Sequence, residues 1–136
     1  VQSFIKNSVM IATASDFPVT NPPDPLTAIE IGVTRATPDI LLPYVASDPA
    51  DPKYKEPLWP EEAASLEDMI ASVTYNGAYE EFLESATGSI EVGKSADMVI
   101  LDRNLFDIQP SEISQSKVML TLFQGKEVYR AESFKE

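Results

Sequence analysis

Neither cysteine nor histidine occurs among the 136 residues of this chain. Without cysteine there are no disulfides, no thiolate nucleophiles and no cysteine-based metal sites. Without histidine there is no Ser-His-Asp triad, and the commonest metal ligand and neutral-pH base is missing. Hydrolytic chemistry by this chain alone would therefore have to use carboxylates, lysine or tyrosine. The lack of cysteine also favours the cytoplasm, a reducing compartment.

Long hydrophobic runs and basic residues are also scarce. No apolar run approaches the roughly 20 residues needed to cross a bilayer, and no basic stretch followed by an apolar one predicts a signal peptide. Lysine and arginine number 10 against 22 acidic residues, for a net charge of -12. Such a surface repels phosphate backbones and anionic lipids, so neither nucleic acid nor membrane is expected as a partner.

Hydrophobic residues make up 43% of the chain and charged residues 24%, which is close to the average soluble domain and predicts a packed core. The segment Val9–Ser15 is short, apolar and partly β-branched. It predicts a strand buried on both faces, as in parallel α/β sheets. Asp16 follows directly, and Pro18 ends any further ladder pairing.

Helices are predicted between this strand and Gly88. A rigid, proline-rich connection at residues 20–25 leads to Asp24 and Pro25, which have the N-cap and first-turn chemistry of a helix over residues 25–33. Residues 37–59 predict a long irregular loop with one short helical turn near residues 40–44. A helix is expected from Pro60, with a capping signature at Ser65 and Asp68. Another follows Thr74 and ends before Gly88. The apolar positions expected to be buried are Leu26, Ile29, Ile31 and Val33 in the first helix, and Ala78, Tyr79, Phe82 and Leu83 in the last.

Strands are predicted after Gly88. Residues 98–101 and 117–123 read as strands, and a turn at residues 124–126 leads to a returning arm at residues 127–129. The sequence therefore predicts two structural zones that meet near Thr87 and Gly88. The first covers residues 1–87 and the second residues 88–136.

The most distinctive stretch runs from Gly88 to Asp102 and reads GSIEVGKSADMVILD. Gly93 can take the positive φ of a tight turn, Ala96 is small enough for close backbone approach, and Asp97 can bond backbone amides near the strand. These are structural roles. The stretch resembles the signature that closes the barrel and re-enters the small β-domain in amidohydrolases such as dihydroorotases, hydantoinases and urease catalytic chains.

A second stretch, residues 14–19, reads ASDFPV. It resembles the end of the eighth barrel strand in amidohydrolase family 3, the branch that includes N-substituted formamide deformylases. Phe17 departs from the tryptophan usual at that position, which is a conservative change. The resemblance continues through residues 65–67, 74–79 and 125–129, so it covers nearly the whole chain.

This resemblance implies the last strand and helices of a TIM-like (β/α)8 barrel, over residues 1–87, followed by strands of a small composite β-sandwich domain. It also implies that Asp16 ligates a divalent metal, expected to be zinc, and accepts a proton from metal-bound water that attacks an amide carbonyl. The implied substrates are small N-acyl or N-formyl amines. From the residues alone, an aspartate at a strand end is more often a turn or cap residue.

The departure from the family pattern concerns the metal ligands. The family site also uses a His-x-His pair and further histidines on earlier strands, and this chain has no histidine. We therefore expect a C-terminal fragment that binds no metal by itself and is inactive without its main partner, the missing N-terminal part of the same protein. Apolar edges left open by that loss predict self-association as a homo-oligomer.

Two other functions stay open. The chain could be a non-enzymatic regulatory or interaction domain on a degenerate amidohydrolase scaffold. A hydrolase based on paired carboxylates has little support, because no Asp-Thr-Gly or similar motif occurs. Arg35 and Trp59 are weaker site candidates, for which a helix-end salt bridge and ordinary packing are the expected roles.

Overall fold

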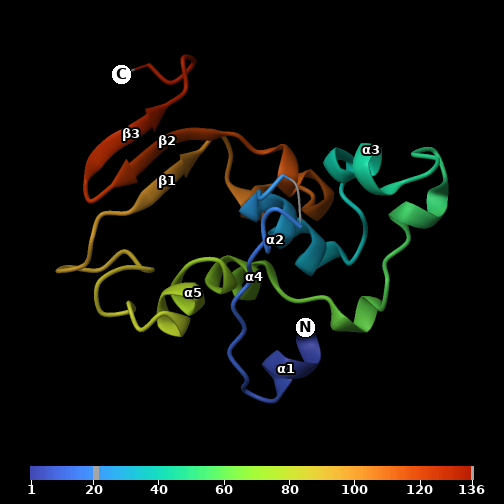
Figure 1. Ribbon diagram of the computed structural model, residues 1–136, viewed down its shortest axis with the longest axis horizontal. Coiled ribbons are helices and arrows are strands. Elements are labelled where there is room, and N and C mark those ends of the chain that lie inside the picture. Colours follow the sequence, from blue (N-terminus) through green and yellow to red (C-terminus); the bar gives the residue numbers. More distant parts are fainter. Residues whose placement is uncertain (20–21, 136) are drawn as a thin grey trace.

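The computed structural model describes residues 1–19 and 22–135 (Figure 1). Short helices come first in the chain and a small sheet comes last, as the sequence predicts. The elements are α1 (Gln2–Lys6), α2 (Pro25–Thr34), η1 (Asp39–Leu41), α3 (Leu42–Val45), η2 (Pro52–Lys55), η3 (Pro60–Glu62), α4 (Leu66–Ser72), α5 (Tyr75–Glu80), β1 (Met98–Leu101), η4 (Leu105–Asp107), η5 (Pro110–Gln115), β2 (Val118–Phe123) and β3 (Lys126–Arg130).

The sheet is antiparallel, with strand order β1-β2-β3, and lies at one end of the molecule (Figure 1). The turn between β2 and β3 uses Gln124 at φ 52° and Gly125 at φ 73°. Two positive φ values are what a two-residue hairpin turn requires, because they match the right-handed twist of the flanking strands. The three strand predictions and the hairpin turn are confirmed.

The core is built around α2, which lies near the centre of Figure 1 beside α4. Its buried members come from α2, α4, η4, η5 and the chain before α4: Ile29, Ala64, Met69, Leu105 and Ile113. The core thus joins elements from both sides of Thr87 and Gly88. The α-helices end before that point and the three strands follow it, with η4 and η5 between β1 and β2, but the division into a barrel part and a sandwich part stays a prediction.

Helix α2 starts as predicted but buries a different face. The Asp24 carboxylate accepts the Leu26 N–H at 3.1 Å, which makes it the N-cap. Of the four positions expected in the core, only Ile29 is fully buried, while Leu26, Ile31 and Val33 are half-buried. Glu30 is buried instead, because η5 packs on that side and the Ser114 N–H donates to the Glu30 carboxylate at 2.8 Å.

The strand predicted for Val9–Ser15 is wrong for this structure. The segment is extended, but no described residue pairs with it as a strand, and Val9 and Met10 are each 48% exposed. A strand of a parallel sheet is buried only when neighbouring strands flank it. The described part of the chain provides no such neighbours, so the apolar run stays open.

Two helix predictions also need correction. The helix expected from Pro60 is a single turn, η3, and α4 begins separately where the Ser65 hydroxyl accepts the Asp68 N–H at 3.1 Å. Helix α5 ends at Glu80, so Phe82 lies beyond it with φ 59° and is 87% exposed. Of its predicted apolar face, only Ala78 is buried.

The loop predicted for residues 37–59 is irregular, and it contains the expected turn as η1 and α3 as well as a further turn, η2. The predicted rigid connection at residues 20–25 falls partly on Thr20 and Asn21, which lie outside the described residues. Within the described ranges, no helix is long and apolar enough to cross a membrane.

Candidate functional site

Asp16 stands at the end of the extended segment, on a tight turn that leads toward α2. Its backbone φ is 53°, and its carbonyl accepts the Val19 N–H at 2.8 Å. The Ser15 hydroxyl accepts the Phe17 N–H at 3.3 Å inside the same turn. Aspartate is one of the few residues that adopt this left-handed conformation readily. The turn leaves the Asp16 side chain exposed.

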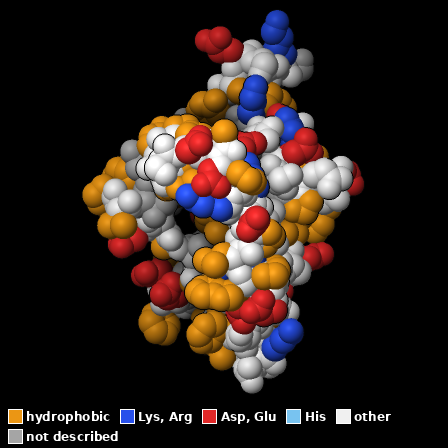
Figure 2. Space-filling model, turned by 90° about the vertical axis from the view of Figure 1, so that its right-hand side faces the viewer, with side chains coloured by type: hydrophobic (Ala, Val, Ile, Leu, Met, Phe, Trp, Pro, Cys, Tyr) orange, Lys and Arg blue, Asp and Glu red, His pale blue; other side chains and the backbone are white. Residues whose placement is uncertain are grey.

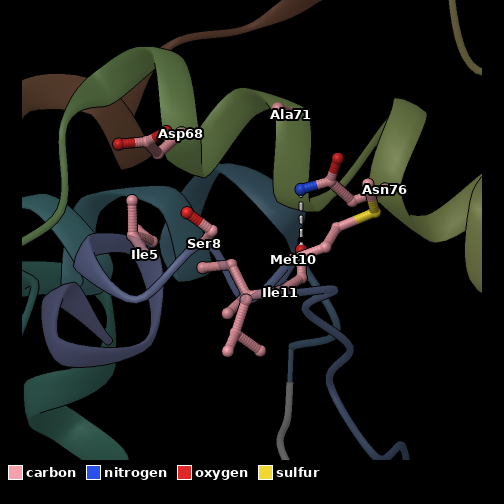
Figure 3. Close-up of a pocket in the computed structure, with 8 residues that line it drawn as sticks. Ile5, Ser8, Met10, Ile11, Asp68, Ala71 and Asn76 are labelled. Carbon is pink, nitrogen blue, oxygen red and sulfur yellow. Dashed lines mark hydrogen bonds between the residues drawn. The ribbon is translucent and has the colours of Figure 1, made fainter.

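Helices α4 and α5 hold the segment that carries Asp16. The Thr13 N–H donates to the Ser72 carbonyl at 3.0 Å, and the Thr13 hydroxyl donates to the Ser72 hydroxyl at 2.9 Å. One turn further along the chain, the Asn76 side-chain amide donates to the Ile11 carbonyl at 2.8 Å (Figure 3). These contacts fix the segment on one side only.

Exposure alternates along this segment. Ile11, Thr13 and Ser15 are half-buried, whereas Ala12, Ala14 and Asp16 are exposed. Successive side chains of an extended chain point to opposite faces. The odd-numbered face therefore contacts the helices and the even-numbered face is open, and the Asp16 carboxylate is exposed in the turn that follows.

Two surface hollows lie near these elements, and Asp16 lines neither. The smaller, of about 310 Å³, lies between α1 and the extended segment on one side and α4 and α5 on the other. Asp68 lies on the side of Ile5 and Ser8, and Asn76 lies opposite Met10 and Ile11 (Figure 3). The larger, of about 650 Å³, lies between the end of α2 and the proline-rich loop.

A divalent metal, implied by the family resemblance, does not fit the residues present. A catalytic zinc site needs about three protein ligands. Among residues 1–19 and 22–135, no group of three His, Cys, Asp or Glu side chains gathers around one point. Asp16 could supply one ligand, and the others would have to come from elsewhere.

The weaker candidates have structural surroundings. Arg35 ends α2 in the left-handed conformation, with φ 59°, and its Nε donates to the Leu58 carbonyl at 3.2 Å. The helix-end salt bridge expected for Arg35 does not form with any described residue. Trp59 is 62% exposed, so the packing role expected for it is wrong.

The stretch from Gly88 to Asp102 has the structural role its composition predicts. Gly93 has φ 97°, and the Ala96 carbonyl accepts the Gly125 N–H at 3.0 Å, which confirms the close backbone approach. Asp97 accepts the Gln124 N–H at 2.7 Å and the Thr87 hydroxyl at 2.9 Å. These hydrogen bonds hold the pKa of the Asp97 carboxyl below its usual value.

The sequence profile of the amidohydrolase family matches residues 1–129, which span both distinctive stretches. The chain belongs to the amidohydrolase family. Its curated relatives include the protein Long After Far-Red 3 of Arabidopsis thaliana, 31% identical over 94% of this chain and 19% of that protein. The N-substituted formamide deformylase of Arthrobacter pascens is 35% identical over 51% of this chain and 13% of that enzyme.

Solved structures give the same assignment. The crystal structure of an amidohydrolase from Thermotoga maritima superposes with a TM-score of 0.57 and 26% identity, over 96% of this chain and 25% of that protein. The amidohydrolase-family chain described here thus spans a quarter or less of the length of these relatives.

Sequence reasoning missed the residues that position Asp16. The contacts of Thr13 with Ser72 and of Asn76 with Ile11 join parts of the chain 59 and 65 residues apart. Asn76 lies within a stretch that resembles the family, but nothing in its local pattern indicates that it binds the Asp16 segment. Only the folded arrangement shows it.

Proposed function

We propose that this amidohydrolase-family chain is part of a hydrolase that cleaves carbon–nitrogen bonds other than peptide bonds, in small N-formyl or N-acyl amines. Family membership supports hydrolysis of carbon–nitrogen bonds in general. The likeness to an N-substituted formamide deformylase supports the narrower class of substrate. Because the chain covers 13% of that enzyme, the substrate is an inference about the intact protein.

In that intact protein, residues 9–15 form the last strand of a (β/α)8 barrel, and the strands after Gly88 belong to the neighbouring β-sandwich. The likeness to the Thermotoga maritima amidohydrolase supports this placement. So does the alternation of exposure along residues 11–16, which is that of a strand covered on one face. Active sites of such barrels lie at the carboxyl ends of the strands. Asp16 directly follows the carboxyl end of the strand proposed for residues 9–15.

The observation that carries the proposal is the exposed Asp16 carboxylate, held by a well-positioned segment yet accepting no hydrogen bond from a described residue. A carboxylate that stabilises its own fold is normally hydrogen-bonded, as Asp97 is. Asp16 is instead free to act on a substrate. General acid–base catalysis of this kind contributes about 10² to 10⁴ in rate.

In the proposed reaction, Asp16 is the only group of the protein that transfers a proton. The oxygen of a water molecule attacks the amide carbonyl carbon while the Asp16 carboxylate takes its proton. The carbon–nitrogen bond then breaks, and Asp16 returns that proton to the leaving nitrogen. The products are a carboxylic acid, formic acid in the case of a formamide, and an amine.

The test is hydrolysis of N-formyl and N-acyl amines by the full-length protein, assayed with added zinc, compared with the variant Asp16→Asn. Asparagine tolerates the positive φ at this position and cannot accept the proton, so the fold should persist while activity falls at least about 100-fold. Asp107→Asn, which changes an exposed aspartate at the end of η4, is the matched control and should keep wild-type activity.

Wild-type rates in Asp16→Asn would refute the role of Asp16. No hydrolysis of any such amine by wild-type full-length protein would refute the enzymatic proposal, and would favour the regulatory scaffold that the sequence leaves open.

A further inference from the structure

The hollow between the end of α2 and the proline-rich loop has a volume of about 650 Å³, which is within the range of small-molecule sites. The loop, with α3 in it, lies on the side of the molecule that faces the viewer in Figure 2. Acidic side chains are more prominent than basic ones on that face, in keeping with the net charge of -12. A basic side chain that lines the hollow is therefore a local exception to an acidic surface.

Hydrogen bonds hold the two walls of this hollow together. The Leu58 N–H donates to the Arg35 carbonyl at 2.8 Å, and the Thr37 N–H donates to the Tyr54 carbonyl at 3.0 Å. The Arg35 Nε adds a third bond, to the Leu58 carbonyl, at 3.2 Å. Small-molecule sites are usually largely formed before the ligand binds. These bonds between residues 35–37 and 54–58 fix the shape of the hollow in that way.

Most of the lining is apolar. Its hydrophobic members come from α2, the loop and the chain just after them: Ile31, Ala36, Pro38, Leu41, Val45 and Leu58. Val45 is 55% exposed and Leu58 is 58% exposed. Covering such side chains removes apolar surface from water, which favours binding of a ligand with an apolar body.

Arg35 supplies a cationic group to the same lining. Its side chain is half-buried, and its Nε is already bonded to the loop, whereas its two terminal nitrogens donate to no described residue. Those two nitrogens can bind a carboxylate through two parallel hydrogen bonds, a geometry that suits arginine. Tyr54 adds a further donor, because its hydroxyl oxygen accepts the Ser47 N–H at 3.3 Å and its proton is left to donate.

Two other charged residues line the hollow. Lys53 is already paired with Asp51 at 2.7 Å. Glu56 is exposed and forms no ion pair with a described residue, so its charge opposes the binding of an anion. Arg35 is therefore the group that selects the charge of a ligand, and Glu56 offers a test of that charge.

We propose that the hollow at the end of α2 binds a small carboxylic acid with an apolar body, whose carboxylate pairs with Arg35 and whose body covers the apolar lining. This site goes beyond the proposed function, because it gives the chain a second place at which a ligand binds. The acids that the proposed hydrolysis releases belong to this class. Binding does not depend on that reaction, so it is measured without any activity.

The experiment titrates the chain of 136 residues with hexanoate, and with hexanol as an uncharged probe of nearly the same shape, by isothermal titration calorimetry. We expect saturable binding of hexanoate and weaker binding of hexanol. Arg35→Gln should weaken the binding of hexanoate at least about tenfold, because it removes hydrogen bonds to a charged group. Lys126→Gln removes the same charge from an exposed position on β3, so it is the matched control and should leave the affinity unchanged.

Two further measurements do not need the Arg35 variant to fold. Glu56→Gln should bind hexanoate more tightly than the wild type at low ionic strength, because it removes a like charge from the lining. In the wild-type chain, hexanoate should shift the NMR signals of the Arg35 Nε–H and the Leu58 amide, and leave the Met10 amide beside the smaller hollow unchanged.

Three results would each overturn the proposal: no saturable binding of hexanoate, equal affinity in Arg35→Gln, or equal affinity for hexanol. Weaker binding by Glu56→Gln, or NMR shifts confined to the smaller hollow, would do the same. Hydrolysis of amines by a protein that binds no hexanoate would refute this site and leave the proposed function intact. Binding of hexanoate by a protein that hydrolyses no amine would do the reverse.

Discussion

Two aspartates, Asp16 and Asp97, lie in the two stretches that most resemble the family, and their surroundings differ in one respect. The Asp97 carboxylate links two parts of the chain, because it accepts one hydrogen bond from Thr87 and another from Gln124 in the hairpin turn. Asp16 accepts no side-chain hydrogen bond from a described residue, although its segment is fixed at Thr13.

The difference separates a region that is complete from one that is open. The hairpin turn at Gln124 and Glu30 in the core around α2 are hydrogen-bonded to residues of this chain. Residues 9–16 bond on one side and leave the other side to a partner or a substrate. Changes in the complete region should therefore alter the stability of the isolated chain, whereas changes on the open face should alter binding and catalysis.

The strongest test of this division compares a core residue with an open-face residue. Ile113 is 1% exposed within the core, so Ile113→Ala should lower the free energy of unfolding by about 2–5 kcal/mol. Met10 is 48% exposed, and Met10→Ala should change it by less than about 0.5 kcal/mol. Urea denaturation of the isolated chain measures the free energy of unfolding of both variants. Equal losses of that free energy would contradict the distinction between the two regions.

The sequence predicted well those features that depend on local chemistry. The Asp24 cap, the irregular proline-rich loop and the hairpin turn each follow from backbone preferences of a few neighbouring residues, and all appear in the structure. The strand at residues 9–15 failed for the opposite reason. Its apolar run indicates burial, but burial depends on neighbouring strands that the described chain does not supply.

The candidate site was suggested by a local sequence pattern in the same way, and its role stays a prediction. The ASDFPV stretch identified Asp16 through the family resemblance, and that stretch lies within the residues matched by the family profile. Its positioning by Ser72 and Asn76 depends on contacts between distant parts of the chain. The burial of Glu30 against Ser114 is of the same kind, since a helix position flanked by apolar residues gives no sign of a carboxylate in the core.

That buried carboxylate provides the next test of the complete region. Glu30 is 3% exposed and accepts the Ser114 N–H at 2.8 Å. Glu30→Ala leaves a buried N–H without an acceptor, which should cost about 1–3 kcal/mol of unfolding free energy. Glu30→Gln keeps a side-chain oxygen that can accept the same bond, so its loss should be smaller. Equal losses in thermal denaturation would show that the hydrogen bond contributes nothing.

A smaller effect is expected at the start of α4, the helix that binds the Asp16 segment. The Ser65 hydroxyl accepts the Asp68 N–H at 3.1 Å and so caps the helix. Ser65→Ala should lower the free energy of unfolding by about 1 kcal/mol. Ser85→Ala is the control, because Ser85 is exposed after α5 and its side chain forms no hydrogen bond with a described residue. A similar loss in both variants would argue against the cap.

The smallest effect concerns the acid stability that Asp97 provides to the complete region. Hydrogen bonds from Gln124 and Thr87 hold the pKa of Asp97 below its usual value near 3.8. The folded state therefore binds fewer protons than the unfolded state in this range, so the stabilisation is present above that usual value and is lost as the pH falls through the folded pKa. The unfolding free energy of Asp97→Asn should accordingly fall less steeply than that of the wild type between about pH 5 and pH 3.

Thr87→Ala should raise the pKa of Asp97 part of the way back, as measured by NMR titration of its carboxyl carbon. An Asp97 that titrates at or above the usual value in the wild type would show that its hydrogen bonds do not favour the charged form, and the contrast with Asp16 would then rest on geometry alone.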